Sequence, residues 1–108
     1  MTPAPRIVIE FIPRDRSRSE YDWANISADG QRVGKARCQM AGTTVTIFSI
    51  LIFPENAGQG LGTQFVEYCK ARFRRIIADR VRPTAIGFWE AMGFHHEEGD
   101  TWVFDRSR

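Results

Sequence analysis

Hydrophobic and polar residues alternate in four segments of the first half of the chain, the pattern of strands with one buried face. The predicted strands are residues 6–12, 21–27, 31–40 and 43–53. Pro13 ends the first strand, and Asp29-Gly30 and Ala41-Gly42 are typical of tight turns between the others. The fourth strand closes with Ile50-Leu51-Ile52-Phe53. This run is apolar at every position and predicts a strand covered on both faces.

The pattern changes to helical spacing after the fourth strand. Apolar residues about one helical turn apart are Phe65, Val66, Cys69, Phe73, Ile76 and Ile77. They predict a helix over residues 63–76 with one apolar face. A short strand is predicted within residues 76–81, after this helix.

A second, shorter helix is predicted from Pro83-Thr84. Thr84 is its expected N-cap, and Gly93 lies where a glycine commonly follows the end of a helix. Residues 94–97 and 101–105 predict a closing hairpin, with its turn at residues 99–100.

The order of these elements defines the expected fold class. Strands, a helix, a strand, a helix and a hairpin describe an α/β (α+β) fold with mixed strand directions, in a single domain over residues 1–108. Residues 13–20 are polar with charges of both signs, and we interpret them as a solvated loop. In the alternative interpretation, Arg14, Arg16 and Arg18 form a patch that meets an acidic partner.

Composition narrows the class of protein. The 15 Lys and Arg against 13 Asp and Glu leave a formal net charge of +2, too small to indicate nucleic-acid binding. The longest apolar run, residues 47–54, is far shorter than the roughly 20 residues of a membrane-spanning helix. Cys38 and Cys69 are too few for a disulfide framework and predict core packing in a reducing cytoplasm. Adjacent His95 and His96 would face opposite sides of a strand, so we predict no metal site.

The glycine-rich segment after the fourth strand carries the clearest chemical signal. Gly58, Gly60 and Gly62 precede a predicted helix, whose unpaired N–H groups and dipole favour an anion. The segment lacks the Gly-Lys-Ser/Thr ending of a nucleotide P-loop. Its third glycine also falls one residue early for a dinucleotide fold. A flexible turn without a ligand is the alternative.

Two segments together resemble the GNAT superfamily of N-acetyltransferases. Residues 52–63 resemble the segment with which this family binds the pyrophosphate of acyl-CoA, and residues 85–94 resemble its C-terminal helix signature. The resemblance extends over roughly residues 31–105, because the spacing and the strand order match. It implies a mostly antiparallel, twisted sheet with two main helices. The two N-terminal helices that are usual in the family would be missing.

The resemblance also implies acetyl-CoA as the acyl donor and direct transfer of its acetyl group to an amine. The pyrophosphate would meet backbone N–H groups of the glycine loop, and the pantetheine arm would pair with the fourth strand. The thioester would lie close to two aromatic residues. The implied cofactor-binding residues are Ile50, Leu51, Ile52, Ala57, Gly58, Gln59, Gly60, Leu61, Gly62, Thr63, Phe88 and Trp89.

Three positions depart from the family pattern. Ala57 stands where a basic or amide residue is usual, Arg82 where asparagine is common, and Trp89 where a tyrosine often protonates the leaving thiolate. No general base is evident, and the catalytic residues stay unknown. The candidates are Glu55, Tyr21, Asp22, Tyr68 and Trp89. A non-catalytic acyl-CoA-binding regulatory module or a protein-interaction domain is therefore the alternative function.

The short segment 13–20 predicts an open acceptor side, because it replaces two helices that wall this site in the family. An open side suits a macromolecular amine such as a lysine or the N terminus of a protein. Arg14, Arg16 and Arg18 would line the opening and favour an acidic acceptor. The open edges of the sheet predict a homodimer.

Overall fold

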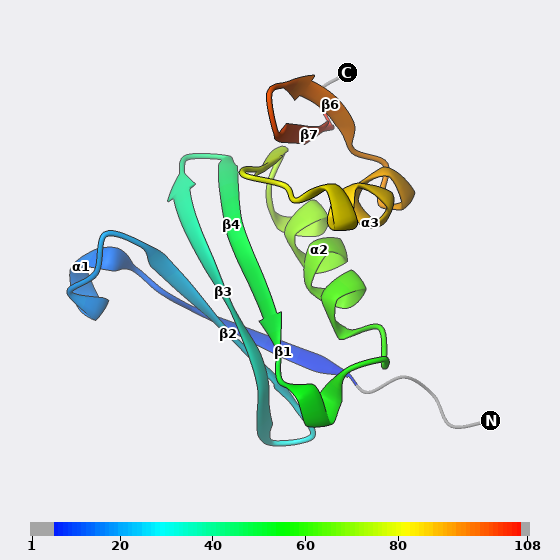
Figure 1. The fold of residues 1–108 in the computed structure, drawn as a ribbon. Helices are drawn as coiled ribbons and strands as arrows, with labels where there is room; N and C mark the ends of the chain where they lie inside the picture. Colours follow the sequence, from blue (N-terminus) through cyan, green and yellow to red (C-terminus); the bar gives the residue numbers. More distant parts are fainter. Residues whose placement is uncertain (1–5, 107–108) are drawn as a thin grey trace.

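The computed structural model describes residues 6–106, and the rest of the predicted domain lies outside them. One seven-stranded sheet has the order β1-β2-β3-β4-β5-β7-β6 (Figure 1). The strands are β1 (Ile7–Ile12), β2 (Asp22–Ala28), β3 (Gln31–Ala41), β4 (Thr44–Ile52), β5 (Arg75–Ala78), β6 (His95–Glu98) and β7 (Thr101–Asp105). Neighbouring strands are antiparallel except for the parallel pair β4 and β5. The predicted mixed, mostly antiparallel sheet is confirmed.

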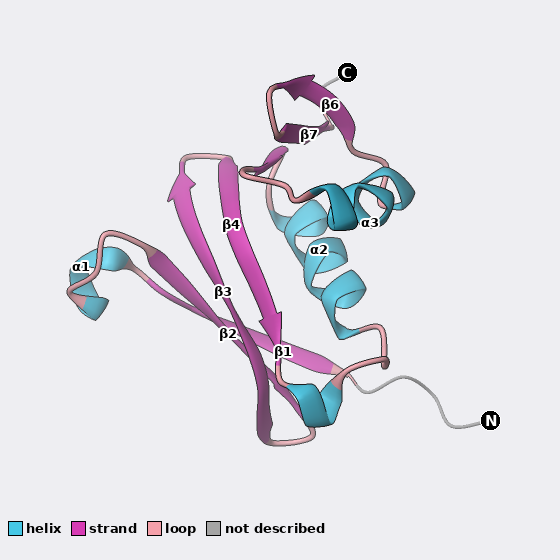
Figure 2. Ribbon diagram, viewed as in Figure 1, coloured by secondary structure: helices cyan, strands magenta, loops and turns pink. Residues whose placement is uncertain are grey.

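Helices lie almost entirely on one side of this sheet. They are α1 (Arg14–Ser17), α2 (Leu61–Arg72) and α3 (Ile86–Ala91), with short 3-10 turns η1 (Pro54–Asn56) and η2 (Pro83–Ala85). Figure 2 shows α2 and α3 beside the sheet and α1 at the far end of β1 and β2. Within the described chain, no helix combines the length and apolar character needed to cross a bilayer.

Segment 13–20 differs from the predicted loop, because its first half forms the helix α1. The backbone N–H of Arg14 donates to the Asp22 carboxylate at 2.7 Å, so a residue of β2 caps this one-turn helix from a distance. The sequence pattern around Pro13 carried no sign of this long-range cap. Only four residues of this segment are helical.

Helix α2 is shorter than predicted and starts earlier. It ends at Arg72, and Phe73 already has extended backbone angles of φ −118° and ψ 150°. The N–H of Arg74 donates to the carbonyl of Thr43 at 2.8 Å, which draws the chain onto the sheet. Ile76 therefore belongs to β5 and not to the helix, although it stays in the same core.

The second helix also begins differently. Thr84 lies inside η2 and caps nothing, since Arg82 and Ala85 hold the N-cap positions of η2 and α3 and neither makes a side-chain cap bond. The prediction for Gly93 is confirmed, because it follows the C-cap of α3 with φ +89°. Asp29 and Gly30 likewise form the predicted tight turn, with φ of +52° and +79°.

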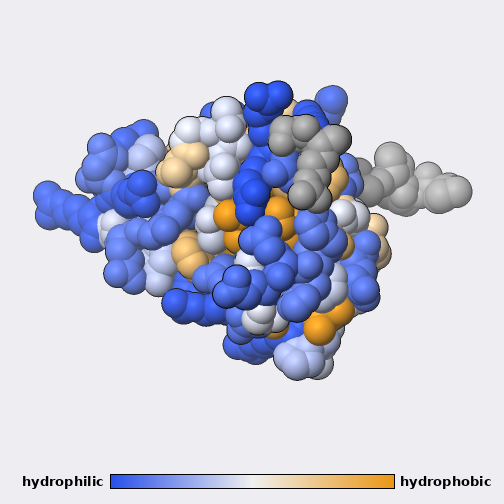
Figure 3. Space-filling view, turned by 90° about the horizontal axis from the view of Figure 1, so that it is seen from above, coloured by the Kyte–Doolittle hydropathy of each residue, from blue (hydrophilic) through white to orange (hydrophobic). Residues whose placement is uncertain are grey.

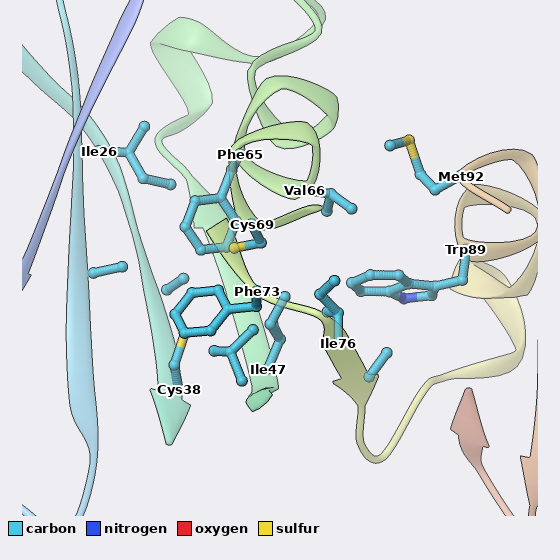
Figure 4. Packing of buried hydrophobic residues seen from close by; sticks show 14 of the residues in the cluster. Ile26, Cys38, Ile47, Phe65, Val66, Cys69, Phe73, Ile76, Trp89 and Met92 are labelled. Atoms are coloured by element: carbon cyan, nitrogen blue, oxygen red, sulfur yellow. The ribbon is translucent and has the colours of Figure 1, made fainter. Parts of the chain in front are cut away.

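The core lies between the sheet and α2, and continues to α3. Figure 4 shows Ile26 and Phe65 facing each other across the space between β2 and α2, and the Trp89 indole pointing toward Ile76 and Val66. All of these side chains are buried. The face seen from above is mostly hydrophilic, with small separate hydrophobic groups (Figure 3). Burial thus fixes the two helices against one face of the sheet.

The end of β4 is not covered on both faces as predicted. Leu51 is 48% exposed, because no helix of the described chain covers its face of the sheet. The parallel pairing of β4 with β5 runs only from Thr44 opposite Arg75 to Ile47 opposite Ala78. Beyond that point the two strands diverge.

Candidate functional site

A cavity of about 670 Å³ opens where β4 and β5 diverge. Its walls come from the end of β4, the chain after β5, the start of α2 and the face of α3. The lining residues are Arg37, Ile47, Phe48, Ser49, Ile50, Leu51, Ile52, Gly62, Asp79, Arg80, Val81, Arg82, Ala85, Phe88 and Trp89. A volume of this size suits a small-molecule ligand.

The backbone of β4 presents unpaired peptide groups to this cavity. Phe53 donates its N–H to Val33 on β3 at 2.8 Å, so residues 53, 51 and 49 pair with β3. Alternation then turns the N–H and C=O groups of Ile50 and Ile52 to the opposite edge, where β5 has already ended. A bulge at Phe48, which has no partner opposite it on β3, bends the strand at the point of divergence.

The glycine loop brings the N terminus of α2 to the same cavity. Gly58 and Gly60 have φ of +81° and +74°, backbone that other residues adopt only with strain. Gly60 is the N-cap and offers no side chain, so the first-turn N–H groups of the 12-residue helix have no side-chain cap. A Cβ on Gly62 would meet no atom of residues 6–106 within 4 Å. The loop therefore leaves room for an anion at the positive end of the helix dipole.

An aromatic wall closes the side of the cavity formed by α3. Trp89 is 7% exposed and lies edge-on to Phe88 and Phe94, with ring centroids 5.1 Å and 4.8 Å apart. Trp89 packs in the core and also lines the cavity. This wall can keep water from a reactive group in the cavity.

Charged side chains also line the cavity. Asp79 and Arg80 follow β5 directly, and Asp79 receives a 3.5 Å hydrogen bond from the Thr101 hydroxyl. Arg37 projects from β3 toward the ring of Tyr21, with its Cζ 4.8 Å from the ring centroid. Sequence reasoning missed these three charged residues. The one available signal was a charged pair directly after a strand, since ligands gather at the carboxyl ends of parallel strands.

The structure brings together some of the residues named from the sequence and separates others. Six of the twelve cofactor-binding candidates line the cavity: Ile50, Leu51, Ile52, Gly62, Phe88 and Trp89. The others are Ala57, Gly58, Gln59, Gly60 and Thr63, which are exposed beside it, and Leu61, which is buried in the core. The loop residues among them approach a ligand through the backbone.

The catalytic candidates named from the sequence lie in different parts of the structure. Tyr21 lies next to a lining residue, with its ring centroid 5.4 Å from that of Phe48. Glu55 is exposed in η1, and Tyr68 packs against Phe11, away from the lining residues. Asp22 is buried and bonded to backbone, which is a structural role.

The arginines of α1 are not at the cavity. Arg14, Arg16 and Arg18 are absent from its walls, and the guanidinium of Arg14 reaches the Met40 carbonyl instead. Elsewhere, the described chain holds no cluster of three or more metal-ligating side chains. Positive charge at the cavity therefore comes from other residues than those predicted.

Comparison with known families identifies the family of this chain. A sequence model described as the acetyltransferase (GNAT) family matches residues 2–94. The chain belongs to the GNAT family. A search of curated proteins found no match.

Solved GNAT structures share the fold at low sequence identity. The Bacillus subtilis N-acetyltransferase YlbP in complex with coenzyme A matches with a TM-score of 0.65 and 14% identity, over 84% of this chain and 72% of that one. A GNAT acetyltransferase from Elizabethkingia anophelis with acetyl-CoA bound gives 0.61 and 12%, over 85% and 78%. The ribosomal-protein-S18-alanine N-acetyltransferase from Escherichia coli gives 0.58 and 20%, over 77% and 64%.

Proposed function

We propose that this GNAT protein is an acetyl-CoA-dependent N-acetyltransferase that transfers acetyl directly to an amine at the open side of the cavity. The observation that carries the proposal is the convergence of the free edge of β4, the glycine loop of α2 and the aromatic wall of α3 on one cavity. Two structures that share the fold hold coenzyme A or acetyl-CoA, which supports the same donor here.

The residues present fit this donor. Backbone N–H groups of Gly58–Thr63 would hold the pyrophosphate, and Leu61 takes part through its backbone alone, since its side chain is in the core. The peptide groups of Ile50 and Ile52 would pair with the pantetheine arm as a further strand would. Ala57 removes one side-chain contact but none of these backbone donors.

Bound acetyl-CoA supplies an acetyl thioester, whose carbonyl carbon the amine nitrogen attacks while coenzyme A leaves as a thiolate. The chain contributes orientation, exclusion of water by Phe88 and Trp89, and a route for the amine proton. Asp79 is the one carboxylate among the described lining residues, and we propose its Oδ atoms as the proton acceptor. The indole of Trp89 donates hydrogen bonds but is no practical acid, so water protonates the leaving thiolate.

Calorimetric titration with acetyl-CoA and with coenzyme A tests the donor site. Wild-type protein is expected to bind both in the micromolar range. Gly62→Glu places a carboxylate at the first turn of α2, where no atom of the described residues blocks the new Cβ, and is expected to abolish binding without loss of stability. Gly62→Gln is the matched control of equal size without the charge. Absence of binding up to millimolar concentrations would contradict the proposal.

Turnover with a panel of amines separates an enzyme from a non-catalytic acyl-CoA-binding module. Binding without release of free thiol, with every acceptor, would favour the module. The GNAT fold and family favour the enzyme.

Compartment and assembly complete the proposal. Two buried, unpaired thiols suit a reducing cytoplasm. Strand β1 ends the sheet and has no neighbour on its outer side within the described chain, which would suit a homodimer.

A further inference from the structure

Two arginines and two aromatic rings form a continuous series of contacts at the cavity, here called the stack, with one arginine at each end and the two rings edge to face in between. The guanidinium carbon of Arg37 lies 4.8 Å from the Tyr21 ring centroid, and the Tyr21 and Phe48 centroids are 5.4 Å apart. The guanidinium carbon of Arg80 lies 5.9 Å from the Phe48 ring centroid. Three of the four residues line the cavity, and the fourth, Tyr21, contacts Arg37 and Phe48. The stack orients two guanidinium groups, which bind carboxylates through paired N–H donors.

The positive charge of this stack is only partly neutralised. No carboxylate of the described residues lies within ion-pair distance of Arg37, and its inaccessible Nε has no hydrogen-bond partner. Among the described residues, Arg80 forms one ion pair, with Asp79 at 3.7 Å between Nε and Oδ2, and the exposure of the Arg80 side chain makes this pair weak. The guanidinium groups thus retain donors for an anion.

The stack lies on the other side of the sheet from the helix α2. Ala36 and Cys38, the neighbours of Arg37 on β3, are buried in the core beneath α2, so Arg37 points to the opposite face. The N–H groups proposed to hold the donor's pyrophosphate are at the start of α2. The arginines of the stack are therefore available to the acceptor.

We infer that the acceptor is an amine that also carries a carboxylate, held by Arg37 and Arg80 while its amino group lies at Asp79. The inference rests on the proposed acetyl transfer and deepens it. Positive and negative groups in one cavity match the two charges of an amino acid. The carboxylate belongs to a free amino acid or to an acidic residue beside a peptide N terminus, since both present the same chemistry.

Matched acceptors test this inference. In the first pair, the acetylation rates of amino acids are compared with those of their amides. In the second pair, the rate for the dipeptide amide Ala-Asp is compared with the rate for the dipeptide amide Ala-Asn. The carboxylates are expected to show kcat/KM values at least roughly tenfold higher, the effect of one charged hydrogen bond. An amide amine is less protonated than that of its amino acid, so this difference works against the expected result. Preference in the first pair identifies free amino acids, and preference in the second identifies acidic peptides.

Variants assign the effect to the stack. Arg37→Gln and Arg80→Gln are expected to raise KM for the carboxylate acceptor roughly tenfold or more, with little change for its amide. Arg37→Lys keeps the charge without the fork and is expected to recover part of the loss. Arg16→Gln on α1 removes the same charge from an exposed position away from the cavity and is the control.

Calorimetry with coenzyme A distinguishes failure of the inference about the acceptor from failure of the proposed function. Equal rates for acids and amides, or acetylation of neither, would overturn the inference while donor binding still supports the proposed function. Weaker coenzyme A binding in Arg37→Gln would also overturn it, because the arginine would then serve the donor. Absence of coenzyme A binding in the wild-type protein would overturn the proposed function and the inference with it.

Discussion

The carboxylate of Asp22 accepts the backbone N–H of Met40 through Oδ2 at 2.7 Å and that of Arg14 through Oδ1 at the same distance. Asp22 is 3% exposed, and it is the one buried charged residue of the described chain. It joins the start of α1 and the end of β3 to β2. The sequence offered Asp22 as a candidate base, whereas its hydrogen bonds explain its burial through structure alone.

Asp22→Asn is expected to destabilise the protein by about 2 kcal/mol. The amide keeps one acceptor oxygen, but its NH₂ group faces a backbone donor that then has no partner. Urea unfolding followed by fluorescence measures the loss, with Asp15→Asn on the exposed face of α1 as control. A change in activity larger than the loss of stability explains would instead assign Asp22 to the site.

Gly34 marks a close approach of β3 to β4. A Cβ at this position would lie 2.4 Å from the Leu51 carbonyl oxygen, a backbone atom that cannot turn aside. Gly34→Ala is expected to cost about 2 kcal/mol or more of unfolding free energy, because the strands must separate. Gly87→Ala in α3, where a Cβ meets no described atom within 4 Å, is expected to be neutral or stabilising. Equal stability of the two variants would contradict this reading of the strand pair.

Periodicity predicted the strands well because neighbouring strands are joined by short turns that the sequence marks. Asp29-Gly30 requires positive φ at both positions, and residues with that freedom are rare outside turns. The glycine loop could be predicted for the same reason, since Gly58 and Gly60 have the positive φ angles that glycine adopts without strain. These features are local, and local signals survive in a single sequence.

The features that the sequence did not predict depend on contacts between segments far apart in the chain. Apolar spacing extended α2 through Phe73 to Ile76, because a helix and a buried strand both place such residues in one core. A hydrogen bond to Thr43, 31 positions before Arg74, ends the helix instead. The grouping of Arg37, Asp79 and Arg80 likewise arises from strand pairing, which no spacing along the chain reveals.

Burial keeps the thiols of Cys38 and Cys69 protonated, and it makes the free energy of unfolding depend on pH in the alkaline range. Burial raises the pKa of Cys69 from 9.0 to about 12, and raises that of Cys38 further, with Cys69 and Asp22 adding to the effect. The folded state therefore keeps protons that the unfolded state loses. This stabilisation is complete below pH 9 and declines as pH rises from 9 toward 12, by about 1.4 kcal/mol per unit for each thiol.

Urea unfolding at several values between pH 8 and pH 11 checks this dependence. Cys69→Ala is expected to show a shallower fall in unfolding free energy than wild-type protein, because one linked proton is gone. The difference between the slopes isolates the thiol from lysine and tyrosine titration, which both proteins share. Parallel slopes, or rapid alkylation of native Cys69 at pH 8, would show that the thiol is not held protonated by burial.

Asp79 connects the geometry of the cavity to the proposed chemistry. It follows Ala78 directly, and its N–H donates to the Ile47 carbonyl at 3.0 Å, so it lies where β4 and β5 separate. Asp79→Asn keeps an acceptor for the Thr101 hydroxyl and is expected to preserve the fold. If Asp79 accepts the amine proton, kcat is expected to fall roughly a hundredfold with unchanged coenzyme A affinity. Steady-state kinetics with calorimetry make the measurement, and a kcat within twofold of wild type would assign the proton to water.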